Sequence, residues 1–353
     1  MGVQQMLLLM SVVGMVLRSL WRELRTRIVK QYCHADQALS AKDDDASQSL
    51  ISITELSNTL RPVKIKTLDS RFLPLGSPSS IRQAPLGRRL IFIGDIHGCI
   101  DELQDLLQKC RYERETDHLI ALGDVVNKGP ESHKVLDFLM TEAASCVRGN
   151  HDDKILRLAA QYLHDIQNSR NRHAESMSKH KDLKARNLAR SLTREHLAWL
   201  QTCPLILRVG NLQKFGEVVA VHAGLVAGLP IDAQHPDAVM NMRSINLLSH
   251  KPSSEHAKAG SVPWYDFWNA YQTTMKALHS SPLGVYLGLT SFCPTTVVYG
   301  HDAKSGLQIH EFTKGLDSGC ASGRQLTAWI VADYGQTKLV QVPCGSRIGQ
   351  NKG

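Results

Sequence analysis

The sequence contains no C-x-x-C pair, although it has eight cysteines. The cysteines are scattered along the chain, a pattern that fits neither a zinc ribbon nor the disulfide framework of a small secreted domain. We therefore expect buried or free thiols rather than structural cross-links.

The sequence also lacks an apolar run of about 20 residues, the length that a membrane-spanning helix needs. Its most apolar stretch, Met6 to Leu17, is shorter, and only Glu23 opposes the basic residues that follow, which are Arg18, Arg22, Arg25, Arg27 and Lys30. We interpret residues 1–30 as a targeting or anchor segment: a signal-type region, a short membrane anchor or a mitochondrial presequence. A vacuolar or other endomembrane location is favoured, with the cytoplasm, the mitochondrion and an untargeted amphipathic helix as alternatives.

With 353 residues, 42% of them hydrophobic and 21% charged, the composition is that of a globular protein with one large domain or two small ones. A net charge of +8 favours a polyanionic partner, although no specific nucleic acid is expected. Residues 31–85 are polar and predict a disordered linker with at most one short strand. The folded domain is expected at 86–345, followed by a tail at 346–353, and the oligomeric state stays open.

A short apolar run, Ile91 to Ile93, ends abruptly at Gly94, as a buried strand does when it delivers its end to a site. Asp95 and His97 follow, two residues apart. In extended chain this spacing places both side chains on one face, where a carboxylate and an imidazole can bind one metal ion. An ordinary turn is the default interpretation of such a pair on its own.

The same arrangement recurs, so that five segments end in Asp, Asn or His beside glycine after an apolar strand: GDIH, GDVVN, GNHD, VHAG and GHD. Strands alternate with helices between them, which predicts an α/β core with its site at the strand ends. Carboxylate, amide and imidazole ligands suit Zn, Mn or Fe(II). Because the ligands are too many for one tetrahedral ion, they indicate two ions that share a bridging carboxylate and activate a water for attack on phosphorus.

A basic insertion, predicted to be helical near 165–195, carries much of the positive charge. Its cations Lys179, Lys181, Lys184 and Arg186 either dock a polyanion or form a solvated helix face. The helix expected after Thr193 has a capping residue, and the aromatic group at Trp264 to Trp268 is expected to pack rather than to bind.

Taken together, GDIHG, GDVVNKGP, GNHD, VHAG and GHD resemble the calcineurin-like metallophosphoesterases. MRSI and GLDSGCASGRQLTA resemble the narrower diadenosine tetraphosphatase-like branch of the phosphoprotein phosphatases, which includes fungal zinc-dependent endopolyphosphatases. The resemblance spans about Leu90 to Val342. It implies a mixed α/β fold with two mixed β-sheets in a sandwich flanked by helices, in four layers, with the site at the sheet edge.

The resemblance also implies roles for individual residues. Asp95 and His97 would hold a first metal ion, Asp124 would bridge, and the second ion would be held by Asn150, His222 and His301. His151 would protonate the leaving oxygen, and the candidates for binding phosphate oxygens are Arg148, Lys128 and Arg243. The metal ions would be Zn, Mn or Fe, with Co possible in vitro.

Two positions depart from the protein phosphatases of the family. Asn127 stands where they carry an Asp that orients the general-acid histidine, and Lys128 stands where they carry an Arg. Asn127 can still accept a hydrogen bond but stabilises an imidazolium less, and Lys128 offers charge without a bidentate fork. Both changes favour the tetraphosphatase-like branch. Asp317 lies in a family motif, and we expect it to support the metal ligands without binding a metal ion itself.

The leading hypothesis is a two-metal hydrolase of phosphoanhydride bonds, and specifically an endopolyphosphatase that cuts inorganic polyphosphate. A diadenosine tetraphosphatase or a cap-like hydrolase would use the same site and is the first alternative. A Ser/Thr protein phosphatase is disfavoured by Asn127. A scaffold with an inactive site is disfavoured because every expected ligand is present.

Overall fold

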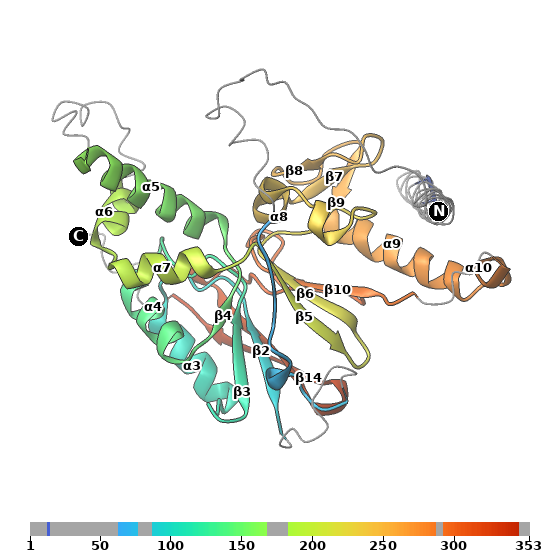
Figure 1. Cartoon of the computed structure of the whole chain (residues 1–353), viewed down its shortest axis with the longest axis horizontal. Helices are drawn as coiled ribbons and strands as arrows, with labels where there is room; N and C mark the ends of the chain where they lie inside the picture. Colours follow the sequence, from blue (N-terminus) through green and yellow to red (C-terminus); the bar gives the residue numbers. More distant parts are fainter. Residues whose placement is uncertain (1–12, 15–62, 77–86, 168–182, 287–291, 346–353) are drawn as a thin grey trace, which may run out of the picture.

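In the computed structural model, two mixed β-sheets face one another and helices cover their outer faces, as expected (Figure 1). The structure describes residues 13–14, 63–76, 87–167, 183–286 and 292–345. Most of the targeting segment, most of the linker, the central part of the basic insertion and the tail lie outside the described residues. No helix within the described ranges is long and apolar enough to cross a membrane.

The six-stranded sheet runs in the order β1 (Ile65–Thr67), β5 (Ile206–Leu212), β6 (Gly216–Val221), β10 (Thr295–Tyr299), β12 (Thr313–Gly315) and β11 (Gln308–Ile309). The five-stranded sheet runs in the order β14 (Gln336–Pro343), β13 (Gln325–Ala332), β2 (Arg89–Ile93), β3 (Asp117–Ala121) and β4 (Ser145–Cys146). Strands β2, β3 and β4 are parallel, as are β6 and β10. Their carboxyl ends therefore meet at one edge of each sheet.

Five helices lie on the outer side of the five-stranded sheet, and they are α3 (Ile100–Cys110), α4 (Ser132–Thr141), α5 (Asn150–Gln167), α6 (Leu183–Ser191) and α7 (Arg194–Thr202). The other sheet is covered by α8 (Pro236–Asn241), α9 (Trp264–His279) and a small antiparallel sheet of β8 (Pro252–Ser253), β7 (Ser244–Asn246) and β9 (Ser261–Pro263). A short helix, α10 (Pro282–Tyr286), follows α9. The order of layers is helix, sheet, sheet, helix.

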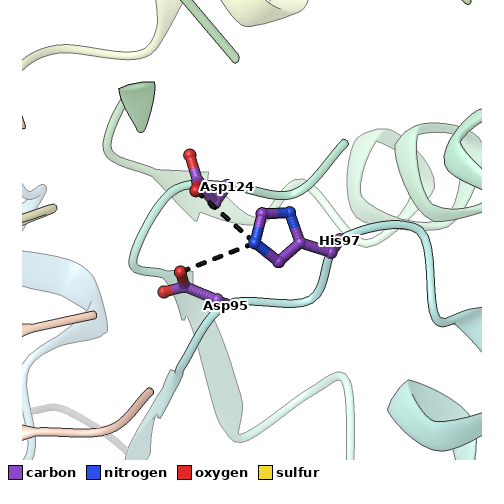
Figure 2. Close-up of side chains that lie close together, drawn as sticks. All are labelled: Asp95, His97 and Asp124. Carbon is purple, nitrogen blue, oxygen red and sulfur yellow. Dashed lines mark ion pairs between the residues drawn. The ribbon is translucent and has the colours of Figure 1, made fainter. Parts of the chain in front are cut away.

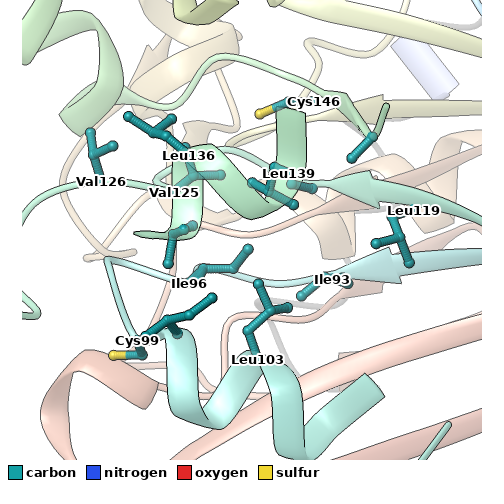
Figure 3. Packing of buried hydrophobic residues seen from close by; sticks show 14 of the residues in the cluster. Ile93, Ile96, Cys99, Leu103, Leu119, Val125, Val126, Leu136, Leu139 and Cys146 are labelled. Atoms are coloured by element: carbon teal, nitrogen blue, oxygen red, sulfur yellow. The ribbon is translucent and has the colours of Figure 1, made fainter. Parts of the chain in front are cut away.

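The alternation of side chains along β2 shows why the sheets stack. Leu90 and Phe92 enter the core between the two sheets, while Ile91 and Ile93 enter the core under the helices. Figure 3 shows the second core, with Leu103 of α3 among its residues. Since a strand presents alternate residues to opposite faces, a continuous apolar run is what a strand buried on both sides requires. Each such side chain contributes about 1.5–3 kcal/mol through burial.

Two smaller predictions are confirmed. Thr193 caps α7 by accepting a hydrogen bond from the backbone N–H of His196, and the His196 side chain completes a capping box. The aromatic group that opens α9 is buried, with Trp264 and Trp268 exposed by only 3% and 5%. It therefore packs in the core and offers no open ring face to a ligand.

Two predictions were wrong in part. Residues 63–76, assigned to the linker, belong to the fold: β1 pairs with β5 at the sheet edge, and Leu68 and Leu73 are buried between the sheets.

Two of the eight cysteines form a disulfide, Cys320–Cys344, which ties the end of β14 to the loop before β13. Spacing along the chain could not indicate this bond, because the two residues are 24 positions apart and only the antiparallel β13–β14 pair brings them together.

Candidate metal centre at the strand ends

Each expected metal ligand lies directly after a strand or at the first residue of a helix. Asp95 and His97 follow β2, Asp124 follows β3, and Asn150 is the first residue of α5. His222 and His301 follow β6 and β10 of the other sheet. Because these strands are parallel within their sheets, all six residues reach the same edge of the sandwich.

Asp95, His97 and Asp124 form a tight buried cluster (Figure 2). One ligand atom from each lies within 4.8 Å of the others. Nε2 of His97 is 3.8 Å from Oδ2 of Asp95 and 3.5 Å from Oδ2 of Asp124. These atoms surround a space in which one metal ion can be coordinated by two carboxylates and an imidazole.

A second group forms on the other oxygen of Asp124. Nε2 of His222 is 3.4 Å from Oδ1 of Asp124 and 3.0 Å from Oδ1 of Asn150. The ring of His301 lies with its centroid 5.0 Å from that of His222. Asp124 thus directs one carboxylate oxygen to each group, which is the arrangement that a bridging ligand needs.

The second ring nitrogen of each histidine is held by a backbone carbonyl. Nδ1 of His97 donates to Val126, and Nδ1 of His222 donates to Leu122. Nε2 of His301 donates to Asn241. These hydrogen bonds leave the lone pair of Nε2 in His222 and of Nδ1 in His301 for a metal ion. The lone pair of Nε2 in His97 faces the ammonium of Lys128 at 2.7 Å, and a metal ion at this position would take the place of that ammonium.

The electrostatics of the cluster fit a cation. Burial raises the pKa of Asp124 to about 7, and burial with the neighbouring carboxylates of Asp317 and Asp124 raises the pKa of Asp95 well above its usual range. Burial lowers the pKa of His222 to about 4 and that of His301 to about 2, so both rings are neutral. Crowded buried carboxylates and neutral imidazoles are the ligand forms that bind divalent ions, and such an ion would relieve the repulsion.

Backbone conformation at the site is strained. His97, Asp124, Asn127, Lys128 and His301 all have positive φ, between 49° and 73°. Non-glycine residues rarely adopt this region, at a cost of about 1–3 kcal/mol each, and they cluster at functional sites. The tight turns bring the strand-end side chains toward the site.

Two glycines allow the close approach. A Cβ atom at Gly149 would lie 2.1 Å from Oδ1 of Asp124, and one at Gly300 would lie 2.1 Å from Oδ1 of Asp95. Both distances are far below van der Waals contact. Gly149 and Gly300 are therefore required because a Cβ atom would collide with these carboxylates, and not only because of the backbone turn.

Sequence reasoning gave no role to Asp152, which is fully buried. Its carboxylate accepts hydrogen bonds from the backbone N–H groups of Asp124 (2.8 Å), Val125 (3.0 Å), Val126 (3.3 Å) and Gly149 (2.9 Å). Asp152 thereby fastens the Asp124 loop to the start of α5. The segment GNHD contained this residue, but nothing in the pattern separated it from an exposed helix-start acid.

His151 stands beside the first cluster, with its ring centroid 5.0 Å from that of His97. The Asn127 side chain uses its oxygen to accept from the backbone N–H of Lys128, so its Nδ2 donates to Nδ1 of His151 over 2.8 Å. Asn127 was expected to accept from this ring, and it donates instead. Burial and the Lys128 ammonium lower the pKa of His151 to about 3, which keeps the ring neutral with its proton on Nε2.

The three candidate phosphate ligands have different surroundings. Nζ of Lys128 lies 2.7 Å from Nε2 of His97, directly at the cluster. Arg243 donates to the backbone carbonyls of Ser254 and His301 beside the second group. Arg148 is turned away, toward the carbonyl of Gln201 and the carboxylate of Asp153, so we do not carry it forward as a phosphate ligand.

A family model described as calcineurin-like phosphoesterase matches residues 88–305, which contain all six candidate metal ligands. The chain belongs to this family. It is 28% identical to a zinc-dependent endopolyphosphatase of Saccharomyces cerevisiae, in an alignment that covers 73% of this chain and 82% of the relative. It is also 28% identical to a symmetrical bis(5'-nucleosyl)-tetraphosphatase of Aromatoleum aromaticum, over 73% of this chain and 97% of that protein.

A solved structure of a candidate diadenosine tetraphosphatase superposes with a TM-score of 0.57 at 29% identity, covering 80% of this chain and 99% of that chain. The family and fold expected from the sequence are therefore confirmed. The protein is a metal-dependent phosphatase with a candidate metal site at Asp95, His97 and Asp124.

Proposed function

We propose that this phosphatase holds two divalent transition-metal ions, Zn, Mn or Fe, and hydrolyses phosphoanhydride bonds. Asp95 and His97 would hold one ion, Asp124 would bridge, and the ligands of the other would be Asn150, His222 and His301. When bound, such an ion pair supplies a hydroxide nucleophile at neutral pH and stabilises charge on the phosphoryl oxygens. Lys128 would bind the remaining oxygens of the phosphate at the metal centre, and Arg243 would bind oxygens of the substrate beside it.

The observation that favours an anhydride over an ester is the hydrogen bond from Asn127 to His151. A neutral imidazole can stabilise the leaving oxygen through Nε2–H, but it transfers a proton poorly. A phosphate leaving group has a second pKa of about 6 and can depart without a proton. An alkoxide is comparable to hydroxide, whose conjugate acid, water, has a pKa of about 15.7, so it needs a proton to depart. The site therefore suits phosphate leaving groups better than serine or threonine.

Replacing Asn127 by Asp tests this argument. A carboxylate facing Nδ1 would stabilise the imidazolium of His151 and raise its pKa, so we expect hydrolysis of a phosphoserine peptide to increase about tenfold relative to pyrophosphate. The matched control is Asn127→Gly, which tolerates the positive φ and offers no partner to the ring. The ratio of kcat/KM values for the two substrates is the measurement, and an unchanged ratio in Asn127→Asp would refute the assigned role.

Among anhydrides, we propose inorganic polyphosphate as the substrate, cut internally. Lys154 and Arg157 lie four and seven positions after Asn150 and so share its face of α5, while Ile155, Leu156 and Ala159 are buried on the other side. Further along, the guanidinium of Arg190 on α6 stacks over the ring of Tyr162, about 18 Å from Asn150 by helical rise. Helix α6 (Leu183–Ser191) contains no acidic residue.

Arg157 also lies 3.0 Å from the carboxylate of Asp153, and the cations that are spread along α5 and α6 favour an extended polyanion over a dinucleoside tetraphosphate. A diadenosine tetraphosphatase, the second candidate, would need open aromatic faces for its bases, and within the described part of the chain the aromatic group of α9 is buried. The similarity to the yeast endopolyphosphatase supports the first candidate and the similarity to the tetraphosphatases supports the second.

Membrane attachment through residues 1–30 and a vacuolar location are also proposed, and fractionation of cells expressing the full chain would test them.

The double variant Lys154→Gln, Arg157→Gln should raise KM for long-chain polyphosphate about tenfold and leave KM for tripolyphosphate within twofold. The wild-type preference for long chains should also fall more steeply with salt than that of the variant. Lys109→Gln, Arg114→Gln is the matched control, because it removes the same charge from the last turn of α3 and from the loop between α3 and β3.

Product length on a gel separates the candidate functions, using the full chain stripped of metal and resupplied with Zn, Mn, Co or Mg in separate reactions. Intermediate-length chains with little free phosphate would support internal cleavage. Cleavage of diadenosine tetraphosphate alone, or an equal loss of the double variant on long and short substrates, would overturn the polyphosphate proposal.

A further inference from the structure

A second polar cluster lies beside the metal centre and centres on Asp302, the residue after His301. Oδ1 of Asp302 accepts a hydrogen bond from Nε2 of His256 over 2.9 Å and lies 3.9 Å from Nε of Arg243. Oδ2 accepts from the hydroxyl of Ser305 over 2.7 Å. The Asp302 side chain is only 10% exposed, so its orientation is fixed by these partners.

The three principal members come from segments that are distant along the chain. Arg243 precedes β7 and His256 follows β8, both in the small antiparallel sheet, whereas Asp302 follows β10 of the large sheet. Arg243 also donates to the backbone carbonyl of His301. Asp302 therefore ties the small sheet to the loop that carries a proposed metal ligand.

Two observations indicate that the cluster is built to receive an anion. Nε of Arg243 is buried and has no hydrogen-bond partner, although the guanidinium is held by the carbonyls of Ser254 and His301. A buried donor without a partner is uncommon, and a ligand oxygen would satisfy it. His256 is the most exposed member of the cluster, with 39% of its side chain accessible against 26% for Arg243, so both side chains can be reached from solvent.

We propose that Arg243 and His256 form a second phosphate subsite, which holds the phosphate next to the one at the metal centre, and that Asp302 is the positioning residue for both. Asp302 holds the two side chains close together, where the N–H donors of a guanidinium and an imidazole ring can share one phosphate group. This subsite rests on the proposed function, because it requires a substrate with at least two linked phosphates. It gives a role to His256, which lies outside the family motifs, and to Asp302, the last residue of the GHD motif, to which the resemblance assigned none.

Binding of methylenebisphosphonate and methylphosphonate to the metal-loaded full chain tests the subsite without turnover. For His256→Gln, the Kd of the bisphosphonate should rise about tenfold and that of methylphosphonate should stay within twofold. His256→Arg should retain the wild-type affinity, a rescue that a merely structural histidine would not show. His279→Gln, in the last turn of α9, is the matched control.

Asp302→Asn should weaken bisphosphonate binding as much as His256→Gln, and the double variant should be little weaker than either single one, since both changes disrupt one unit. Bisphosphonate affinity within twofold of wild type in His256→Gln would overturn the proposal, as would an equal loss with methylphosphonate. The polyphosphate proposal is tested separately, by the products that the wild-type protein forms.

Discussion

Replacing Asp124 by Asn is expected to lower kcat/KM on any phosphoanhydride substrate by about a thousandfold, or about 4 kcal/mol of transition-state stabilisation. The two oxygens of Asp124 face Nε2 of His97 and Nε2 of His222, so its carboxylate reaches a ligand nitrogen in each of the two groups. An amide offers one oxygen and an N–H group in place of two anionic oxygens, and it cannot bridge two cations.

The measurement combines steady-state kinetics with metal content determined on the same preparation. Asp124→Asn should bind less metal than wild type after equal loading, whereas Asp105→Asn, on the exposed side of α3, should match wild type in both respects. Full activity in Asp124→Asn would show that the bridging assignment and the two-ion arrangement are both wrong.

Replacing Asp152 by Ala is expected to destabilise the protein by about 3–5 kcal/mol, which is a large part of the total stability of a typical domain. The change leaves buried N–H groups of Asp124, Val125, Val126 and Gly149 without their acceptor. An unsatisfied buried donor costs about 1–3 kcal/mol, and movement of the loop would recover part of the total.

Urea unfolding of the metal-free protein, followed by tryptophan fluorescence, measures this effect. Asp105→Ala is the control and should change the free energy of unfolding by less than about 0.5 kcal/mol. If Asp152→Ala unfolds at the same urea concentration as wild type, then another acceptor replaces the carboxylate and Asp152 does not fasten the loop.

Much of this protein follows from local patterns in its sequence. Short apolar runs that end in glycine and an acid or a histidine predicted β2, β3, β6 and β10, because a strand buried on both faces must be continuously apolar. The same runs placed the candidate ligands, since the carboxyl ends of parallel strands meet at one edge. Thr193 indicated the start of α7 by its capping chemistry alone.

The features that local patterns did not reveal depend on contacts between distant segments. Residues 63–76 lie at the edge of a sheet whose other strands come more than a hundred positions later, and Cys320 meets Cys344 only because β13 and β14 pair. A polar segment and scattered cysteines carry no local signal of such partners.

The amino-acid sequence by itself therefore determined the strand ends and the candidate ligands, because these depend on side-chain period and on which residue types follow each strand. Its motifs implied the family and the layered architecture by resemblance. Only the tertiary structure decided the direction of the hydrogen bond from Asn127 to His151, the role of Asp152 and the Asp302 cluster. Each of these depends on which donor faces which acceptor across separate segments. Such a choice is made by three-dimensional packing and not by spacing along the chain.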